Sequence, residues 1–141
     1  MQAEAKTDIF NKGYTTDKPR ILLVEDDLIT NEVIQFYLKN DFIVDIALDE
    51  QQASGQMKNN KYFAVLLDIN LGKGGSGLNV LKELRKTPGL EKLPVIAETA
   101  FALNGDSEEF LTAGCNYYLS KPYMKQELLN VLQKIKEDAG Q

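Results

Sequence analysis

The sequence predicts a doubly wound α/β protein, in which helices cover both faces of a parallel β-sheet. Three observations support this fold class. Five short apolar runs follow Pro19, each run precedes a stretch with helical spacing of its apolar residues, and the first run, Ile21–Val24, contains aliphatic residues only. Purely aliphatic strands are typical of parallel sheets that are buried on both faces. Right-handed connections between such strands place helices on both sides of the sheet.

The first strand is expected at Ile21–Val24 and the second at Ile43–Ala47. Asp27 stands between them, where the N-cap residue of a helix is expected. Asp45 interrupts the second strand, which suits a strand at the edge of the sheet better than one at its centre. The apolar residues of the intervening helix recur at helical spacing: Val33, Ile34, Tyr37 and Leu38.

Two further helices and one strand are expected in the middle of the chain. Asp49 and Gln52 resemble a capping pair that opens a short, polar helix running through Lys58. Phe63–Leu67 is the third strand, and Leu78–Arg85 is the third helix, with leucines at intervals of three residues.

The fourth strand is expected at Pro94–Glu98 and the fifth at Asn116–Ser120. Between them, Asp106 and Glu109 form a second capping pair, and Gly114 is placed to end the helix that they open. Five strands and five helices in the strand order 2-1-3-4-5, the flavodoxin-like arrangement, put the second strand at an edge. The apolar face of the last helix is formed by Leu128, Leu129, Leu132 and Ile135.

Composition limits the class of protein. The 141 residues, 43% hydrophobic and 26% charged, suit one soluble globular domain. Residues 1–19 are polar and lack sustained periodicity, so we interpret them as a flexible tail or linker, and residues 20–141 as the domain. No apolar run approaches the ~20 residues of a membrane helix, so no membrane association is expected. The single cysteine, Cys115, suits a cytoplasmic location.

The absence of histidine narrows the chemistry further. It excludes Ser-His and Cys-His catalysis and any zinc site with a histidine ligand. A net charge of −5 argues against nucleic-acid binding by this domain, because such binding needs a basic surface. Carboxylates therefore remain as the groups that carry chemistry.

Polar side chains follow four of the five expected strands. Glu25 and Asp26 come directly after the first strand, Asp68 after the third, Thr99 after the fourth and Lys121 after the fifth. Doubly wound sheets bind ligands at the carboxyl ends of the strands, near the point where the strand order reverses. The first and third strands are neighbours at that point, so the three carboxylates are expected to share one crevice.

Carboxylates gathered in one crevice repel each other, and a divalent cation that prefers oxygen ligands, such as Mg²⁺, relieves this repulsion. Lys121 adds a compact positive charge, and the Thr99 hydroxyl adds a hydrogen-bond donor. Three acids, a metal, a lysine and a hydroxyl indicate a phosphoryl-transfer site in which one carboxylate is the nucleophile.

The strand ends carry four motifs in this order along the chain: Val24-Glu25-Asp26, Leu67-Asp68, Thr99-Ala100 and Lys121-Pro122. Together they resemble the receiver domain of two-component response regulators, over residues 20–138. The resemblance implies that Asp68 accepts a phosphoryl group from a phosphohistidine, that Lys121 contacts the phosphate and that Thr99 closes on it.

The resemblance also assigns a cofactor and supporting residues. Mg²⁺ is expected on Glu25, Asp26 and Asp68 and on the backbone carbonyl of Asn70. Lys121-Pro122 would carry the family's cis peptide bond.

The resemblance implies that three side chains regulate the phosphorylated state. Tyr118 matches the family's switch aromatic, and it would read out phosphorylation on the face of the fourth helix, fifth strand and fifth helix. Phe101 and Asn70 stand where side chains modulate dephosphorylation. Phe101 is bulkier and less polar than many of its counterparts, so slow loss of the phosphoryl group is expected.

The implied partner is a sensor histidine kinase or a histidine phosphotransfer protein, and a homodimer is left open. The domain is expected to catalyse its own phosphorylation and dephosphorylation rather than a metabolic reaction. The stimulus, the kinase and the downstream target are not readable from the sequence.

Three other functions each fit part of the sequence. Residues 72–77 fit G-x-G-x-x-G, the fingerprint of a Rossmann-type nucleotide-binding domain, but they follow the third strand rather than the first, and Asp68 stands at that mouth. An aspartate-nucleophile phosphatase usually carries a second aspartate where this chain has Asn70. A degenerate receiver that only binds partners is disfavoured by the complete set of acids, threonine and lysine.

Overall fold

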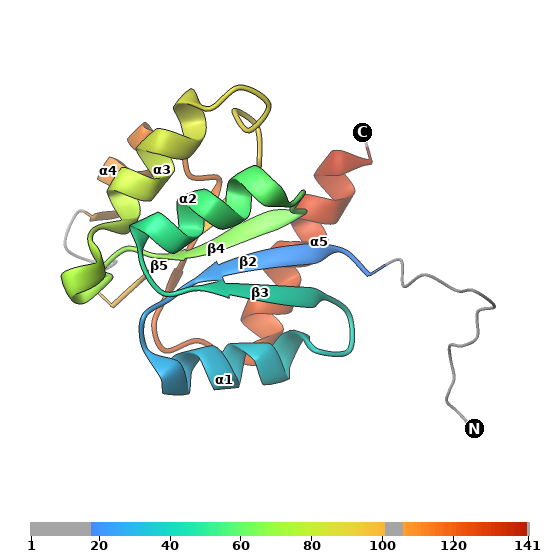
Figure 1. Cartoon of the computed structure of the whole chain (residues 1–141). Coiled ribbons are helices and arrows are strands. Elements are labelled where there is room, and N and C mark those ends of the chain that lie inside the picture. The colour runs from blue at the N-terminus through green and yellow to red at the C-terminus, as the bar shows by residue number, and fades with distance from the viewer. Residues whose placement is uncertain (1–17, 101–105, 141) are drawn as a thin grey trace.

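The computed structural model describes residues 18–100 and 106–140 and shows a single five-stranded parallel sheet between two layers of helices (Figure 1). The strand order is β3-β2-β4-β5-β6. This order confirms the predicted 2-1-3-4-5 arrangement, because β2 is the first strand of the described chain. Within the described residues, no helix has the length and apolar character needed to span a bilayer.

The observed elements lie close to their predicted positions. The strands are β2 (Arg20–Val24), β3 (Ile43–Ala47), β4 (Ala64–Asp68), β5 (Val95–Thr99) and β6 (Tyr117–Ser120). The helices are α1 (Leu28–Leu38), α2 (Glu50–Asn59), α3 (Gly77–Lys86), α4 (Asp106–Ala113) and α5 (Lys125–Ala139), with a short 3-10 turn, η1 (Gly72–Gly74), before α3.

Two strands extend one residue beyond their predicted ends. We predicted the third and fourth strands from apolar side chains, so the predictions stopped before Asp68 and Thr99. The backbone continues the ladder through both, since Asp68 pairs with Glu98 and Thr99 pairs with Ser120. These two polar residues at the mouth of the sheet are therefore held by strand hydrogen bonding.

The helix ends largely follow the predicted capping residues. Asp27 accepts a hydrogen bond from the Thr30 backbone at 3.0 Å, and Asp49 accepts one from the Gln52 backbone at 2.8 Å. Gly114 ends α4 with a φ of 111°, and its N–H donates to the Phe110 carbonyl at 3.1 Å. The predicted cap at Asp106 falls on a side chain outside the described set.

Each face of the sheet is covered by its own hydrophobic core. Alternate strand residues point to opposite faces, so α2, α3 and α4 pack on one side and α1 and α5 on the other (Figure 1). On α1, Ile34 and Leu38 face the sheet as predicted, whereas Val33 points to solvent and is 43% exposed. The lone cysteine, Cys115, is a free, buried member of the first core.

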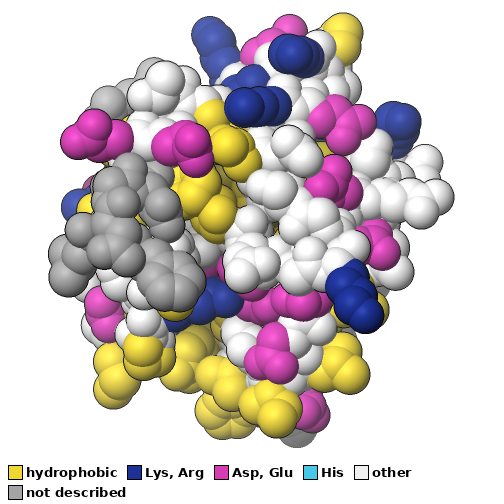
Figure 2. All heavy atoms as spheres, turned by 90° about the vertical axis from the view of Figure 1, so that its left-hand side faces the viewer, with side chains coloured by type: hydrophobic (Ala, Val, Ile, Leu, Met, Phe, Trp, Pro, Cys, Tyr) yellow, Lys and Arg dark blue, Asp and Glu magenta, His cyan; other side chains and the backbone are white. Residues whose placement is uncertain are grey.

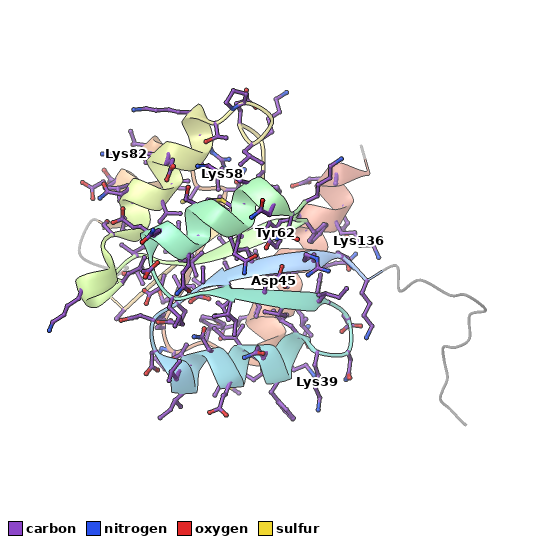
Figure 3. All side chains as sticks on the ribbon, in the orientation of Figure 1. Lys39, Asp45, Lys58, Tyr62, Lys82 and Lys136 are labelled. Atoms are coloured by element: carbon purple, nitrogen blue, oxygen red, sulfur yellow. The ribbon has the colours of Figure 1, made fainter. Side chains whose placement is uncertain are left out.

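The edge position of β3 explains its polar residue. Asp45 accepts hydrogen bonds from Arg20 at 2.8 and 3.0 Å and from the Tyr62 hydroxyl at 2.7 Å. Figure 3 shows Asp45 and Tyr62 lying close together beside the sheet edge. Burial and the neighbouring Asp45 carboxylate raise the pKa of Tyr62. The aspartate that interrupts the apolar pattern is thus paired with groups at the margin of the sheet, as an edge strand permits.

The glycine loop packs against protein rather than forming a phosphate cradle. A Cβ on Gly75 would lie 1.8 Å from the Glu50 carboxylate, and Glu50 accepts a hydrogen bond from the Ser76 backbone at 2.7 Å. A Cβ on Gly77 would lie 2.3 Å from the carbonyl oxygen of Asp68. The Glu50 carboxylate accepts a hydrogen bond from the Ser76 N–H of this loop, and its negative charge would repel a nucleotide phosphate there. The nucleotide-binding alternative is therefore not favoured.

The close approach at Gly77 predicts a difference between two glycines. Gly77→Ala should lower the free energy of unfolding by at least about 1–3 kcal/mol, because the new methyl group meets the backbone of Asp68 and Ile69. Gly55→Ala is the matched control, since an added Cβ in α2 meets nothing within 4 Å, and it should raise stability by roughly 0.5–1 kcal/mol. Urea unfolding measures both. Equal effects of the two substitutions would contradict the packing described for the loop.

Candidate functional site

The carboxyl ends of four strands bring the predicted polar residues to one crevice. Glu25 follows β2 directly, Asp68 ends β4, Thr99 ends β5 and Lys121 follows β6. Because β2 and β4 are neighbours in the sheet, their acidic residues lie side by side. Figure 2 views this end of the molecule and shows acidic side chains next to a basic one in the middle of the face.

Three carboxylates form a compact cluster. One oxygen each of Glu25, Asp26 and Asp68 lies within 4.8 Å of the others. Glu25 is 1% exposed and Asp68 is 6% exposed, whereas Asp26 is exposed to solvent. Three carboxylate oxygens, two buried and one open to water, suit a hard divalent cation that keeps part of its hydration shell. The predicted acidic set is therefore assembled at one point.

Lys121 neutralises part of this cluster. Its ammonium nitrogen lies 2.8 Å from Glu25 Oε1 and 3.1 Å from Asp68 Oδ2. Burial alone would lower the pKa of Lys121, but its hydrogen bond to Glu25 and the nearby charge of Asp68 outweigh this, so the pKa is raised. The backbone N–H of Lys121 donates to the Thr99 carbonyl at 2.9 Å, and the Lys121–Pro122 peptide is cis, as the resemblance implied.

Burial and nearby negative charge raise the pKa of Glu25 and of Asp26. The pKa of Glu25 is raised, mainly by burial, although the hydrogen bond from Lys121 opposes the shift. The pKa of Asp26 is also raised, by burial and then by the neighbouring Glu25. Below this pair, the buried Asn31 side chain donates to the Glu25 carbonyl at 2.9 Å. The turn that carries both acids is thus tied to α1.

The remaining predicted residues lie at different places around the cluster. Asn70 donates its backbone N–H to Asp68 Oδ1 at 3.2 Å and accepts from the Gly72 N–H at 2.9 Å. Thr99 is buried at the end of β5. Tyr118 lies on β6 with 38% of its surface exposed, so its ring is at the surface in this conformation. Phe101 lies outside the described residues.

One carboxyl near the site was not predicted. Glu98 is fully buried beside Thr99, and it accepts a hydrogen bond from the Tyr123 hydroxyl. Burial raises its pKa to about 8, against an ordinary value of 4.5, although Tyr123 and Lys121 favour the charged form. The signal in the sequence was an acid inside an otherwise apolar strand. The sequence places Glu98 only at the end of the predicted fourth strand.

Comparisons with known proteins agree with this geometry. The sequence model of the response regulator receiver domain family matches residues 21–133. The transcriptional regulatory protein DltR of Streptococcus agalactiae is 40% identical over 78% of this chain and 48% of its own length. Hybrid signal transduction histidine kinase M of Dictyostelium discoideum is 32% identical over 82% of this chain but only 5% of the kinase. The chain thus spans about half, or much less, of the curated relatives that it matches.

Solved structures match over nearly their full length. The receiver domain of sensor histidine kinase PA1611 from Pseudomonas aeruginosa, whose structure has a magnesium ion coordinated in the active site cleft, is 36% identical. It superposes with a TM-score of 0.77 and covers 83% of this chain and 96% of that one. The chemotaxis protein CheY4 of Vibrio cholerae, 20% identical with a TM-score of 0.79 over 84% and 98% of the two chains, shows the same fold.

The buried acid predicts how stability depends on pH. A carboxyl whose pKa is raised on folding binds its proton more tightly in the folded chain, so its contribution to stability is complete below about pH 4.5 and is lost as the pH rises through about 8. Glu98→Gln should therefore gain stability relative to wild type across this range, at up to about 1.4 kcal/mol per pH unit.

Urea unfolding at pH 5, 6.5 and 8 measures this difference. Glu32→Gln, on the exposed side of α1, is the matched control and should run parallel to wild type. Parallel profiles for Glu98→Gln and wild type would contradict the raised pKa.

Proposed function

The chain belongs to the response regulator receiver domain family of two-component systems, and from this premise we propose that Asp68 is its phosphoacceptor. The observation that carries the proposal is the contact of Lys121 with Glu25 and Asp68 at 2.8 and 3.1 Å, inside a cluster of three carboxylates. Of the two buried carboxylates that contact Lys121, Asp68 is the one that ends the central strand β4, between the strand that precedes Glu25 and the strand that ends at Thr99.

In the proposed reaction, a carboxylate oxygen of Asp68 attacks the phosphorus of a phosphohistidine. The new O–P bond forms as the P–N bond breaks, and the imidazole nitrogen leaves with the bonding electron pair. Lys121 lies within reach of the incoming phosphoryl oxygens, where its ammonium stabilises the negative charge of the transition state. The Thr99 hydroxyl donates a hydrogen bond to the phosphoryl group once it is attached.

We propose that the three carboxylates hold Mg²⁺, together with the backbone carbonyl of Asn70. The donor set fits, because all side-chain ligands are carboxylate oxygens. A divalent cation between them would relieve their mutual repulsion. Magnesium in this place would neutralise charge on the carboxylates and on the phosphoryl oxygens. The magnesium found in the cleft of the PA1611 receiver domain supports the assignment.

A docking surface for the phosphodonor borders the site. Four apolar side chains on α1 are exposed by 65%, 72%, 43% and 62%, and we call them the α1 apolar patch: Leu28, Ile29, Val33 and Phe36. Figure 2 shows hydrophobic side chains along the lower edge of the face, over α1 and below the acidic side chains. An exposed apolar patch of this kind marks a protein interface. We propose that the histidine-bearing helices of a sensor kinase or phosphotransfer protein dock here.

Phosphorylation would be read out on the face formed by α4, β6 and α5. Movement of Thr99 toward the phosphoryl group leaves space that the surface-exposed Tyr118 ring can enter. One charge-assisted hydrogen bond provides roughly 1.5–3 kcal/mol, whereas full reversal of a 1:99 equilibrium needs about 5.5 kcal/mol. Lys121, the metal or a binding partner therefore has to complete the switch.

The remaining assignments complete the proposal. Residues 20–141 act as the receiver unit, residues 1–19 act as a tail or linker, and the domain works in the cytoplasm. Asn70 and Phe101 modulate dephosphorylation.

Phosphorylation at Asp68 can be tested without any kinase. Acetyl phosphate should add one phosphate to the wild-type chain in the presence of Mg²⁺ and none with a chelator, because nucleophile, lysine and metal ligands lie in one domain. Intact mass spectrometry measures the addition. Asp68→Asn should not be labelled, and Asp45→Asn at the sheet edge is the matched control that should be. Labelling of Asp68→Asn would overturn the assignment.

The docking surface predicts a difference between two phosphodonors. The first phosphodonor is a phosphorylated histidine kinase domain that phosphorylates the wild-type chain. With this donor, the double variant Ile29→Ser/Phe36→Ser should react at least about tenfold more slowly, because each buried anchor contributes more than about 1 kcal/mol to docking. Labelling by acetyl phosphate should stay at the wild-type rate. Leu111→Ser, an exposed leucine on α4, is the control. Equal slowing with both donors would rule out a docking role.

A further inference from the structure

We propose that Tyr123 and Glu98 form a positioning pair that holds Lys121 over Asp68. This inference rests on the proposed phosphoacceptor function and goes beyond it, because neither residue belongs to the acidic cluster. Tyr123 follows Lys121 by two residues, and Glu98 precedes Thr99 directly. The pair therefore connects the segment that carries the lysine to the strand that carries the threonine.

Glu98 offers a rigid point of attachment. It lies in β5 between β4 and β6, paired with Asp68 on one side and with Leu119 on the other. Its side chain is fully buried on the α1 and α5 side of the sheet, where one oxygen accepts from the Tyr123 hydroxyl. The other oxygen has no hydrogen-bond partner within the described chain. The interaction with Tyr123 is thus the one that holds this carboxyl group in place.

The segment between β6 and α5 needs such an attachment. β6 ends at Ser120 and α5 begins at Lys125, so Lys121 lies in the connection. Its backbone is held by one hydrogen bond to the Thr99 carbonyl, at 2.9 Å. Tyr123 adds a second tie to the same strand one residue earlier, at Glu98. Two ties to adjacent residues of β5 fix both the position and the orientation of the connection.

The position of Lys121 matters because its ammonium contacts two acids at once. It lies 2.8 Å from Glu25 and 3.1 Å from Asp68. If the connection shifts, the ammonium can stay on Glu25 and lose Asp68, where the phosphoryl group would be attached. A displacement of about 1 Å in a positioning group can lower a reaction rate by up to about 100-fold.

A simpler role for Glu98 would be that of a core residue whose polar group is satisfied. A leucine of similar size would fill the same space without placing a carboxyl group near Glu25 and Asp68, both of which disfavour its ionised form. Burying a polar group in this way costs free energy unless its hydrogen bond is made. The two roles differ in one respect: only the positioning role links the Tyr123 hydroxyl to the lysine.

The experiment compares four variants by two measurements. Initial rates of labelling by acetyl phosphate with saturating Mg²⁺ should fall by about 10- to 100-fold in Tyr123→Phe and Glu98→Leu. Glu98→Gln keeps an acceptor oxygen for the Tyr123 hydroxyl and should retain most of the rate. Tyr37→Phe is the matched control, because it removes another tyrosine hydroxyl from the groove beside Tyr123. Rates are compared at equal folded fraction, measured by urea unfolding.

The second measurement needs no phosphodonor. NMR of the Lys121 ammonium reports its contacts with Glu25 and Asp68, and its resonance should shift in Tyr123→Phe and Glu98→Leu but not in Tyr37→Phe. If acetyl phosphate does not phosphorylate the wild-type chain, but the Lys121 resonance still shifts in Tyr123→Phe, the phosphoacceptor function is refuted and the positioning pair is not. Wild-type rates and an unmoved Lys121 resonance in Tyr123→Phe would overturn the positioning pair, even if Glu98→Leu fails to fold.

Discussion

The crevice depends on the ammonium group of Lys121. Glu25 and Asp68 are buried side by side at the ends of adjacent strands, where two carboxylates repel each other unless a cation lies between them. Lys121 follows β6, on the other side of β5 from Asp68, and its ammonium contacts both acids. Its own burial is made tolerable by the same contacts, as its raised pKa shows. Burying any one of these charges alone would cost free energy, and their contacts with each other offset that cost.

This balance also suits a site that accepts further charge. A divalent cation can share the carboxylates with the ammonium, and a phosphoryl group brings negative charge for both cations to contact. Asp26 differs from its neighbours because it is exposed, so the cluster opens to water on one side.

The parallel sheet serves as the frame that makes these contacts repeatable. Asp68 and Thr99 are both paired within the ladder, so their positions are set by backbone hydrogen bonds and not by loop conformation. The glycine loop adds a second constraint, since Gly77 passes so close to the Asp68 carbonyl that a side chain has no room. Glu50 fills the loop from α2. Gly77 thus allows the backbone of the loop to pack closely against the end of β4.

The sequence alone determined the strands, the order of the sheet and the residues at its mouth, because these follow from local signals. Apolar runs predict buried strands, Asp27 and Asp49 accept hydrogen bonds at helix starts, and Asp45 predicted an edge. Only the tertiary structure decided how residues distant in the chain pair. Three contacts depend on side chains that converge from separate elements. Lys121 contacts both Glu25 and Asp68, Glu50 accepts a hydrogen bond from the glycine loop, and Glu98 accepts one from Tyr123. The outward face of α1 is a further example. Helical periodicity groups Val33 with Ile34 and Leu38, but in the structure only Ile34 and Leu38 pack against the sheet, and Val33 is exposed.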